Sequence, residues 1–353
     1  MITRRRAVAE MLAGTALLAA GCGTEGPVRA AGDGSTLRTT YRDPRGTGAL
    51  APGPGERLRA RTELGARAPH AAPLATVAHL TDAHVLDAES PARVTFLDRL
   101  GPPFQSTFRP HETLTAQVLA GALTAIHALS PDAVIQGGDL IDNDQANELA
   151  VALAVLKGGR VAPGSGGAGY FGIQSAANAD PFYYRPDLDA PRHAGLLEAA
   201  RRRFTSPGVL GPWLPVLGDH DVLVAGEIAP TAQTRALALG DQAVWDLPSG
   251  LTAPPGLISG SGANGATAGF SPDGPPSPGL VDRFLAQALG APKVRVPADR
   301  ARRELDPAEA IQSLRAASGR RATGGWLDYS FDLGAHVRAI VLDLARRGGG
   351  SGG

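Results

Sequence analysis

Three short apolar runs constrain the fold of this chain more than any other feature. They occupy residues 74–80, 132–136 and 213–217, and each has the length and composition of a buried strand. Between the first two, residues 111–129 carry apolar side chains at helical spacing until Ser130 and Pro131 end the pattern. A strand, a helix and a second strand in succession predict a parallel sheet layered with helices, which is an α/β fold.

Composition is compatible with one large globular domain and excludes some classes of partner. The chain has 353 residues, of which 43% are apolar, so it can bury a substantial core. Its formal net charge is zero, without the basic excess that marks nucleic-acid binding. We therefore expect no nucleic-acid partner.

The N-terminus has the pattern of an export signal. An arginine cluster at residues 4–6 precedes a short apolar run at 7–20, and Leu-Ala-Ala-Gly-Cys at 18–22 is similar to a bacterial lipobox. Cys22 is the only cysteine in the chain. We predict a twin-arginine signal over residues 1–22, with lipid attached to Cys22 and the protein anchored at the outer face of the bacterial cell membrane. The alternative is a buried helix that ends in cysteine.

Beyond the signal, the pattern divides the chain into a lead-in and a folded domain. Residues 23–72 are rich in glycine, proline and threonine without a sustained period, which predicts a flexible tether. The folded domain is expected over 73–353, with a Gly/Pro-rich insertion or cap at 222–325. Further helices are predicted at 145–156, 193–204, 231–239, 281–289 and 307–317, and a hairpin at 326–333 and 336–343.

A long irregular segment at 158–190 gathers aromatic residues in a chain that has only 5% of them. Two interpretations are open. The aromatic side chains either fasten this loop to the body of the domain or line a wall that faces a substrate.

Chemically active side chains follow each predicted strand. Asp82 and His84 come after the first, Asp139 after the second, and Asp219, His220 and Asp221 after the third. Because the carboxyl ends of neighbouring parallel strands meet at one edge of a sheet, we expect these side chains to converge. Carboxylate and imidazole together suit Mn, Fe or Zn better than Ca.

The motifs in their order resemble the calcineurin-like metallophosphoesterase superfamily. They read Asp-x-His at 82–84, Gly-Asp-Leu-Ile-Asp-Asn at 138–143 and Gly-Asp-His-Asp at 218–221. The resemblance implies a layered α/β/β/α sandwich and a site for two divalent metal ions. It also implies hydrolysis of a phosphate monoester or diester by a water that the two metals activate, the substrate being a small molecule or derived from the cell envelope.

Carried over residue by residue, the resemblance makes Asp82, His84 and Asp139 metal ligands. His220 becomes the acid or phosphate contact, and Asp221 the residue that orients it. Asp219 stands where the family has asparagine. The added negative charge implies tighter metal binding, lower Lewis acidity and a weaker activity.

The family also has later histidine motifs, which this chain lacks. The only histidine after His220 is His336, and it stands alone. We therefore expect a fold that is incomplete at its C-terminus, as in a piece of a longer protein, or a degenerate site. The alternatives to an enzyme are an envelope lipoprotein that binds a ligand or partner without turnover, and a metal-binding fragment.

Overall fold

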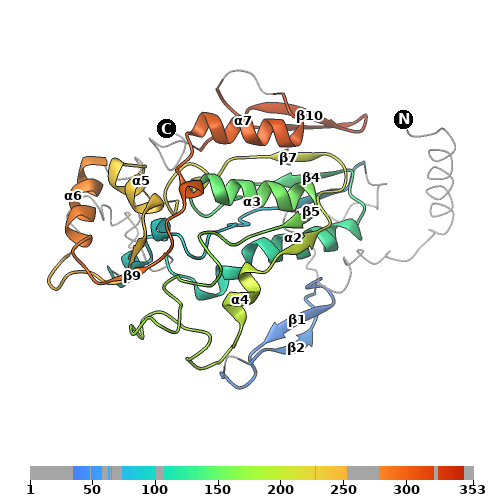
Figure 1. Cartoon of the computed structure of the whole chain (residues 1–353). Coiled ribbons are helices and arrows are strands. Elements are labelled where there is room, and N and C mark those ends of the chain that lie inside the picture. Colours follow the sequence, from blue (N-terminus) through green and yellow to red (C-terminus); the bar gives the residue numbers. More distant parts are fainter. Residues whose placement is uncertain are drawn as a thin grey trace.

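The computed structural model describes residues 35–47, 49–57, 63, 65, 74–100, 107–226, 228–252, 278–321 and 325–345. Within them the chain is mixed α and β, with several small sheets (Figure 1). The predicted export signal and Cys22 lie outside the described residues. No helix in the described ranges is both long and apolar enough to span a lipid bilayer.

The largest sheet of the described residues is parallel and three-stranded. It consists of β3 (Val77–Leu80), β4 (Ala133–Gln136) and β7 (Trp213–Pro215), with β4 in the middle. All three strands lie where the apolar runs predicted them. Ala133 and Val134 point to opposite faces of β4 and both are buried, which explains why the run is continuously apolar rather than alternating.

Three helices cover one face of this sheet (Figure 1). They are α2 (Thr115–His127), which follows the 3₁₀ helix η4 (Pro110–Leu114), α3 (Ala146–Lys157) and α7 (Pro307–Ser318). Their buried side chains form one cluster with the sheet, including Leu119, Leu123, Ala152, Val155, Ile311 and Leu314 packed with Val134 and Trp213. The helices predicted at 111–129, 145–156 and 307–317 are confirmed.

A hairpin covers the other face of the sheet. Its strands β10 (Tyr329–Leu333) and β11 (Val337–Val341) are antiparallel, with Gly334 left-handed in the turn at φ +68°. Leu333 packs on Ala133 and Leu214, the residues of β4 and β7 that face away from the helices. The predicted hairpin is thus confirmed, and the layers run from helices through parallel sheet to hairpin.

Residues 222–325 do not form one insertion. A second hydrophobic cluster joins α5 (Ala232–Leu239), α6 (Pro278–Ala288) and the 3₁₀ helix η3 (Thr95–Leu100), beside the antiparallel pair β8 (Gln242–Val244) and β9 (Lys293–Arg295). The 3₁₀ helix η5 (Arg300–Arg302) follows. α7 instead packs in the main core, because its apolar face lies against the helical side of β7.

Part of the predicted tether is ordered. β1 (Thr39–Arg42) and β2 (Ala51–Pro54) pair in antiparallel register. The turn between them is organised by Asp43, whose Oδ1 accepts the backbone N–H of Arg45 (3.3 Å) and of Thr47 (3.1 Å), and by left-handed Gly46. The interpretation of 23–72 as irregular throughout is therefore corrected for 39–54.

The aromatic segment is fastened to the body of the protein. Tyr183 is fully buried with its ring edge against Phe108 (4.9 Å between centroids), and its hydroxyl donates to the carbonyl of Trp245 (2.5 Å). These contacts favour the structural interpretation of the loop. The remaining short elements are η2 (Pro91–Arg93), β5 (Gly159–Val161), α4 (Leu196–Arg201) and β6 (Phe204–Ser206), with β5 and β6 paired.

Candidate metal centre

Two loops leave the carboxyl ends of β3 and β4 side by side. Backbone hydrogen bonds join them: the N–H of Asp82 donates to the carbonyl of Gly138 (3.1 Å), and that of His84 to the carbonyl of Asp139 (3.0 Å). A third bond runs from Val85 to Leu140 (3.0 Å). The predicted ligands on these loops are therefore held by the backbone of a neighbouring segment.

Three of the predicted site residues have left-handed backbones. Asp82, His84 and Asp139 have φ values of 54°, 41° and 48°. This region is uncommon for residues other than glycine, and each such residue costs on the order of 1–3 kcal/mol unless its surroundings impose it. All three residues lie at the same end of one sheet. The surrounding structure therefore holds their side chains in place despite an unfavourable backbone conformation.

Two glycines allow the chain to approach the site closely. A Cβ at Gly218 would overlap the carboxylate of Asp139, and a Cβ at Gly226 would overlap the imidazole of His220. Gly226 also has a left-handed φ of +70°. Gly218, which precedes Asp219 in the motif, therefore leaves room for the carboxylate of Asp139 from the neighbouring loop.

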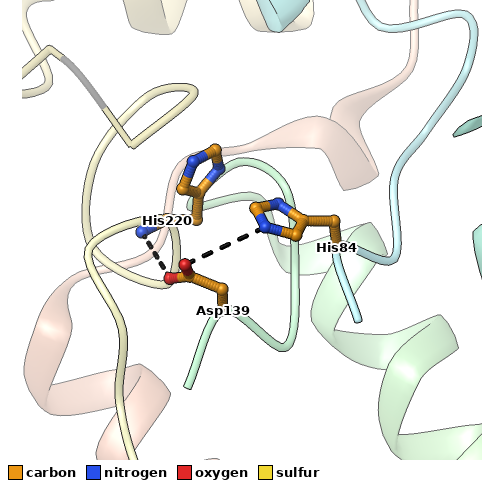
Figure 2. A group of neighbouring side chains, drawn as sticks. All are labelled: His84, Asp139 and His220. Atoms are coloured by element: carbon orange, nitrogen blue, oxygen red, sulfur yellow. Dashed lines mark hydrogen bonds and ion pairs between the residues drawn. The ribbon is translucent and has the colours of Figure 1, made fainter. Parts of the chain in front are cut away.

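The three loops bring His84, Asp139 and His220 together (Figure 2). One potential ligand atom from each lies within 4.8 Å of the others, so this cluster could hold a metal ion. The Nε2 atom of His84 is 3.9 Å from Oδ2 of Asp139, and the backbone N–H of His220 donates to Oδ1 of Asp139 (3.1 Å). The rings of His84 and His220 meet edge to face, with centroids 4.3 Å apart.

Asp142 orients both histidines, a role that its sequence motif did not predict. Its Oδ1 lies 3.1 Å from Nδ1 of His84, and its carbonyl accepts a hydrogen bond from Nδ1 of His220 (2.7 Å). With Nδ1 engaged, Nε2 of His84 faces Asp82 (4.0 Å) and Asp139. A carboxylate behind one imidazole nitrogen with the other nitrogen free is the usual arrangement of a metal-binding histidine. The signal was present, since Asp142 belongs to the motif at 138–143.

Arg109 is a second residue of the site that the sequence did not reveal. Its Nη2 atom is 3.0 Å from Oδ1 of Asp142, and its Nε atom is 2.5 Å from Oε1 of Glu112. It lies before η4, 33 residues upstream of Asp142, in a segment without a motif. Only the tertiary structure brings it to the back of the two histidines.

The electrostatics of the cluster favour a cation. Burial, reinforced by the charge of Asp219, raises the pKa of Asp139 to about 6. Burial opposes ionisation of Asp142, but the hydrogen bond with His84 and the charges of His220 and Arg109 hold its pKa at about 2. Burial on its own would lower the pKa of His84, yet its bond with Asp142 and the charges of Asp142 and Asp139 raise it. The pKa values of Asp139 and His84 are therefore both raised, which means that protons stay bound more strongly in this group of acidic side chains.

Asp82 and Asp219 lie at the border of the cluster. The Asp82 side chain is 58% exposed, and its Oδ1 lies 4.0 Å from Nε2 of His84. Asp219 accepts the backbone N–H of His220 at Oδ1 (3.2 Å), and Asp139 accepts the same N–H. Asp82 and Asp219, both predicted as metal ligands, do not belong to the group of three that could hold a metal ion, whereas His220, predicted as the acid, does.

Asp221 does not orient His220, contrary to the prediction. It is buried, and its Oδ1 accepts the backbone N–H groups of Leu140 (3.0 Å) and Ile141 (3.1 Å), while Oδ2 accepts that of Gly218 (2.8 Å). Burial raises its pKa to about 7. The Asp221 carboxylate thus joins the loop after β4 to the loop after β7 through their backbone N–H groups. The His220 imidazole is held by Asp142 instead.

The donor set fits a borderline divalent ion. Imidazole and carboxylate ligands without thiolate are those that bind Mn, Fe or Zn. His336 is exposed in the turn of the β10–β11 hairpin, outside this cluster.

No family model, no curated protein and no solved structure matches the chain.

Proposed function

We propose that this chain carries the metal site of a calcineurin-like metallophosphoesterase and hydrolyses phosphate esters. The observation that carries the proposal is the orientation of His84. Its Nδ1 is engaged by Asp142 and its Nε2 faces two carboxylates at the ends of neighbouring parallel strands.

Asp82, His84 and Asp139 would hold one divalent ion, and Asp139 and Asp219 would contribute to a second. The ions would be Mn, Fe or Zn. When bound, such ions supply activation of water and neutralisation of phosphoryl charge, which ester hydrolysis requires. The shared N–H contact of Asp139 and Asp219 supports the second assignment, because it keeps both carboxylates beside the same turn.

His220 is the residue that we assign to the leaving group. A carbonyl can only accept, so Nδ1 of His220 carries the proton in its bond to Asp142. The carboxylate oxygen Oδ1 of Asp142 lies 3.7 Å from the same nitrogen. A proton on Nε2 would then be available to hydrogen-bond a phosphoryl oxygen or to pass to the departing alkoxide.

The fold supports this proposal in its coarse features. The layer of helices, the parallel sheet and the β hairpin of the described residues are compatible with three of the four layers of an α/β/β/α sandwich. The substrate would be a phosphate-ester small molecule or a product of the cell envelope. Export and a lipid anchor at Cys22 complete the proposal and place the activity outside the cytoplasm.

The test combines metal binding with turnover. We expect Mn²⁺ to raise the melting temperature of the purified chain, since a ligand at 100 times its Kd stabilises the folded state by about 2.7 kcal/mol. EDTA should reverse the shift. Hydrolysis of an aryl phosphate or an aryl phosphodiester should depend on the same Mn²⁺, and the comparison of the two substrates separates a monoesterase from a diesterase.

Asp139→Asn provides the residue-level control. It should remove both the Mn²⁺-induced shift and turnover, because the bridging position loses its charge. Asp332→Asn, on the exposed outer side of the hairpin, should change neither. Absence of binding of Mn²⁺, Fe²⁺ and Zn²⁺ to the unaltered chain would contradict the proposal. Mn²⁺ binding without turnover would favour a lipoprotein that binds its ligand without hydrolysis.

A further inference from the structure

Arg109 lies directly behind the candidate metal centre and bridges two acidic residues. Its guanidinium contacts Asp142 through Nη2 and Glu112 through Nε. The two carboxylates come from different elements, since Glu112 belongs to η4 and Asp142 to the loop after β4. Arg109 therefore ties η4, which leads into α2, to the loop that carries Asp139.

The oxygen that Arg109 contacts is the one that holds His84. Oδ1 of Asp142 is 3.0 Å from Arg109 Nη2, 3.1 Å from His84 Nδ1 and 3.7 Å from His220 Nδ1. A displacement of this oxygen is therefore transmitted to the imidazole ring of His84. Arg109 thus acts on the metal centre without facing it.

Asp142 and Glu112 are nearly buried, with 8% and 12% of their side chains exposed. Burial and the negative charge of Asp142 both raise the pKa of Glu112, which places the two carboxylates within electrostatic reach of each other. A guanidinium can contact two carboxylates through different nitrogens, whereas an ammonium is a single point charge; here Nη2 donates a hydrogen bond to Asp142 and Nε forms an ion pair with Glu112. Without Arg109, two like charges in a poorly solvated site would repel each other.

We propose that Arg109 is a positioning residue that clamps Asp142 against Glu112 and thereby fixes His84 with Nε2 toward Asp82 and Asp139. The inference rests on the proposed function in so far as His84 is taken as a metal ligand. Arg109 is 30% exposed, so its replacement should leave the fold intact.

The first test observes the ring directly and needs neither metal nor substrate. In the metal-free protein, a long-range ¹H–¹⁵N spectrum should show a downfield, slowly exchanging Nδ1–H signal, assigned to His84 by its absence in His84→Asn. In Arg109→Gln this signal should be lost or exchange with solvent, since Asp142 is released. Arg338→Gln removes a matched arginine from a carboxylate pair on the hairpin and should leave the signal unchanged.

The second test measures Mn²⁺ affinity by calorimetry. Loss of a group that orients a metal ligand typically weakens binding 10–100-fold, and we expect about a tenfold loss for Arg109→Gln. The Mn²⁺ affinity of Arg109→Lys should lie between that of the unaltered protein and that of Arg109→Gln. Arg109→Gln combined with Glu112→Gln should recover most of the affinity, because the charge that repels Asp142 is gone. A merely structural role would not produce this rescue.

Two results would overturn the inference. An unchanged His84 signal in Arg109→Gln would show that Asp142 does not depend on the guanidinium. An increase in KM alone, with kcat and Mn²⁺ affinity unchanged, would make Arg109 a substrate contact. Failure of the unaltered chain to bind Mn²⁺, Fe²⁺ and Zn²⁺ would defeat the proposed function, while the ring signal would still decide the role of Arg109.

Discussion

At the residue scale, His220 depends on the absence of a side chain at position 226. The backbone of Gly226 lies so close to the imidazole that a Cβ there would overlap the ring. The ring is also held at Nδ1 by the carbonyl of Asp142, so it cannot rotate away without losing that bond. Gly226 is therefore part of what determines the position of the proposed acid.

We predict that Gly226→Ala lowers kcat by about 100-fold, since a displacement of about 1 Å at a reacting group can cost that much. Gly319→Ala is the control, because Gly319 has nearly the same φ (+68° against +70°) with open space around its Cβ position. Both variants should lose about 1 kcal/mol of unfolding free energy from the left-handed backbone alone. Equal activity of the two variants in a steady-state assay would disprove the placement of His220.

At the element scale, α7 behaves as part of the main core and is well defined by its ends. Asp306 caps its N-terminus by accepting the N–H of Ala308 (3.0 Å), Pro307 occupies the first turn, and left-handed Gly319 follows the last residue. Its apolar face reaches the same cluster as α2 and α3. The polypeptide thus leaves the main core after β7 and returns to it at α7.

We predict that Leu314→Ala lowers the free energy of unfolding by about 2–5 kcal/mol, the usual cost of a cavity in a packed core. Leu314 is 1% exposed. Leu239→Ala at the end of α5 makes the same chemical change at a position that is 38% exposed, and should cost less than about 1 kcal/mol. Urea titration measures both; similar losses would mean that α7 is not a core helix.

Sequence patterns were sufficient for the longer elements. The helices α2, α3 and α7 span about three turns each, which is enough for an apolar stripe to be visible. The strands β5, β6, β8 and β9 have three residues each and show no period, so only their pairing across long sequence distances defines them. The β1–β2 hairpin was missed because glycine and proline dominate its second strand.

The site was predictable as far as its residues follow strands. The convergence of His84, Asp139 and His220 was predicted from their order along the chain, because strand ends in a parallel sheet converge. The roles of Asp142 and Asp221 could not be assigned in this way, since which of two acidic residues contacts an imidazole depends on loop geometry. Arg109 carried no signal at all.

At the scale of the whole molecule, one buried arginine joins segments that are far apart in the sequence. Arg302 is fully buried, and its Nε donates to Asp87 (2.8 Å), which follows the His84 loop. Its Nη1 donates to the carbonyl of Pro297 (2.7 Å) and its Nη2 to Oγ of Ser165 (2.8 Å). The region before α7, the long irregular loop and the site loop are thus fastened at a single guanidinium.

We predict that Arg302→Met destabilises the whole protein by about 3–5 kcal/mol, because Asp87 would remain as a buried charge without its partner. Arg338→Met, which breaks an exposed pair with Asp332, should cost no more than about 1 kcal/mol. Denaturant unfolding followed by two probes, one near Trp213 and one near Trp245, would reveal whether both regions are lost together. A small loss for Arg302→Met would show that the three segments are joined by other contacts.

The left-handed backbones of Asp82, His84 and Asp139 also imply a trade-off between the stability of the protein and its proposed activity. Glycine would occupy these three positions without strain, so replacement there relieves the folded state while it removes a proposed ligand. In metal-free medium, selection for thermal stability alone would therefore remove these residues first. A laboratory lineage evolved only to survive heat without metal should accumulate glycine at these positions, and one selected for turnover should retain the strained residues.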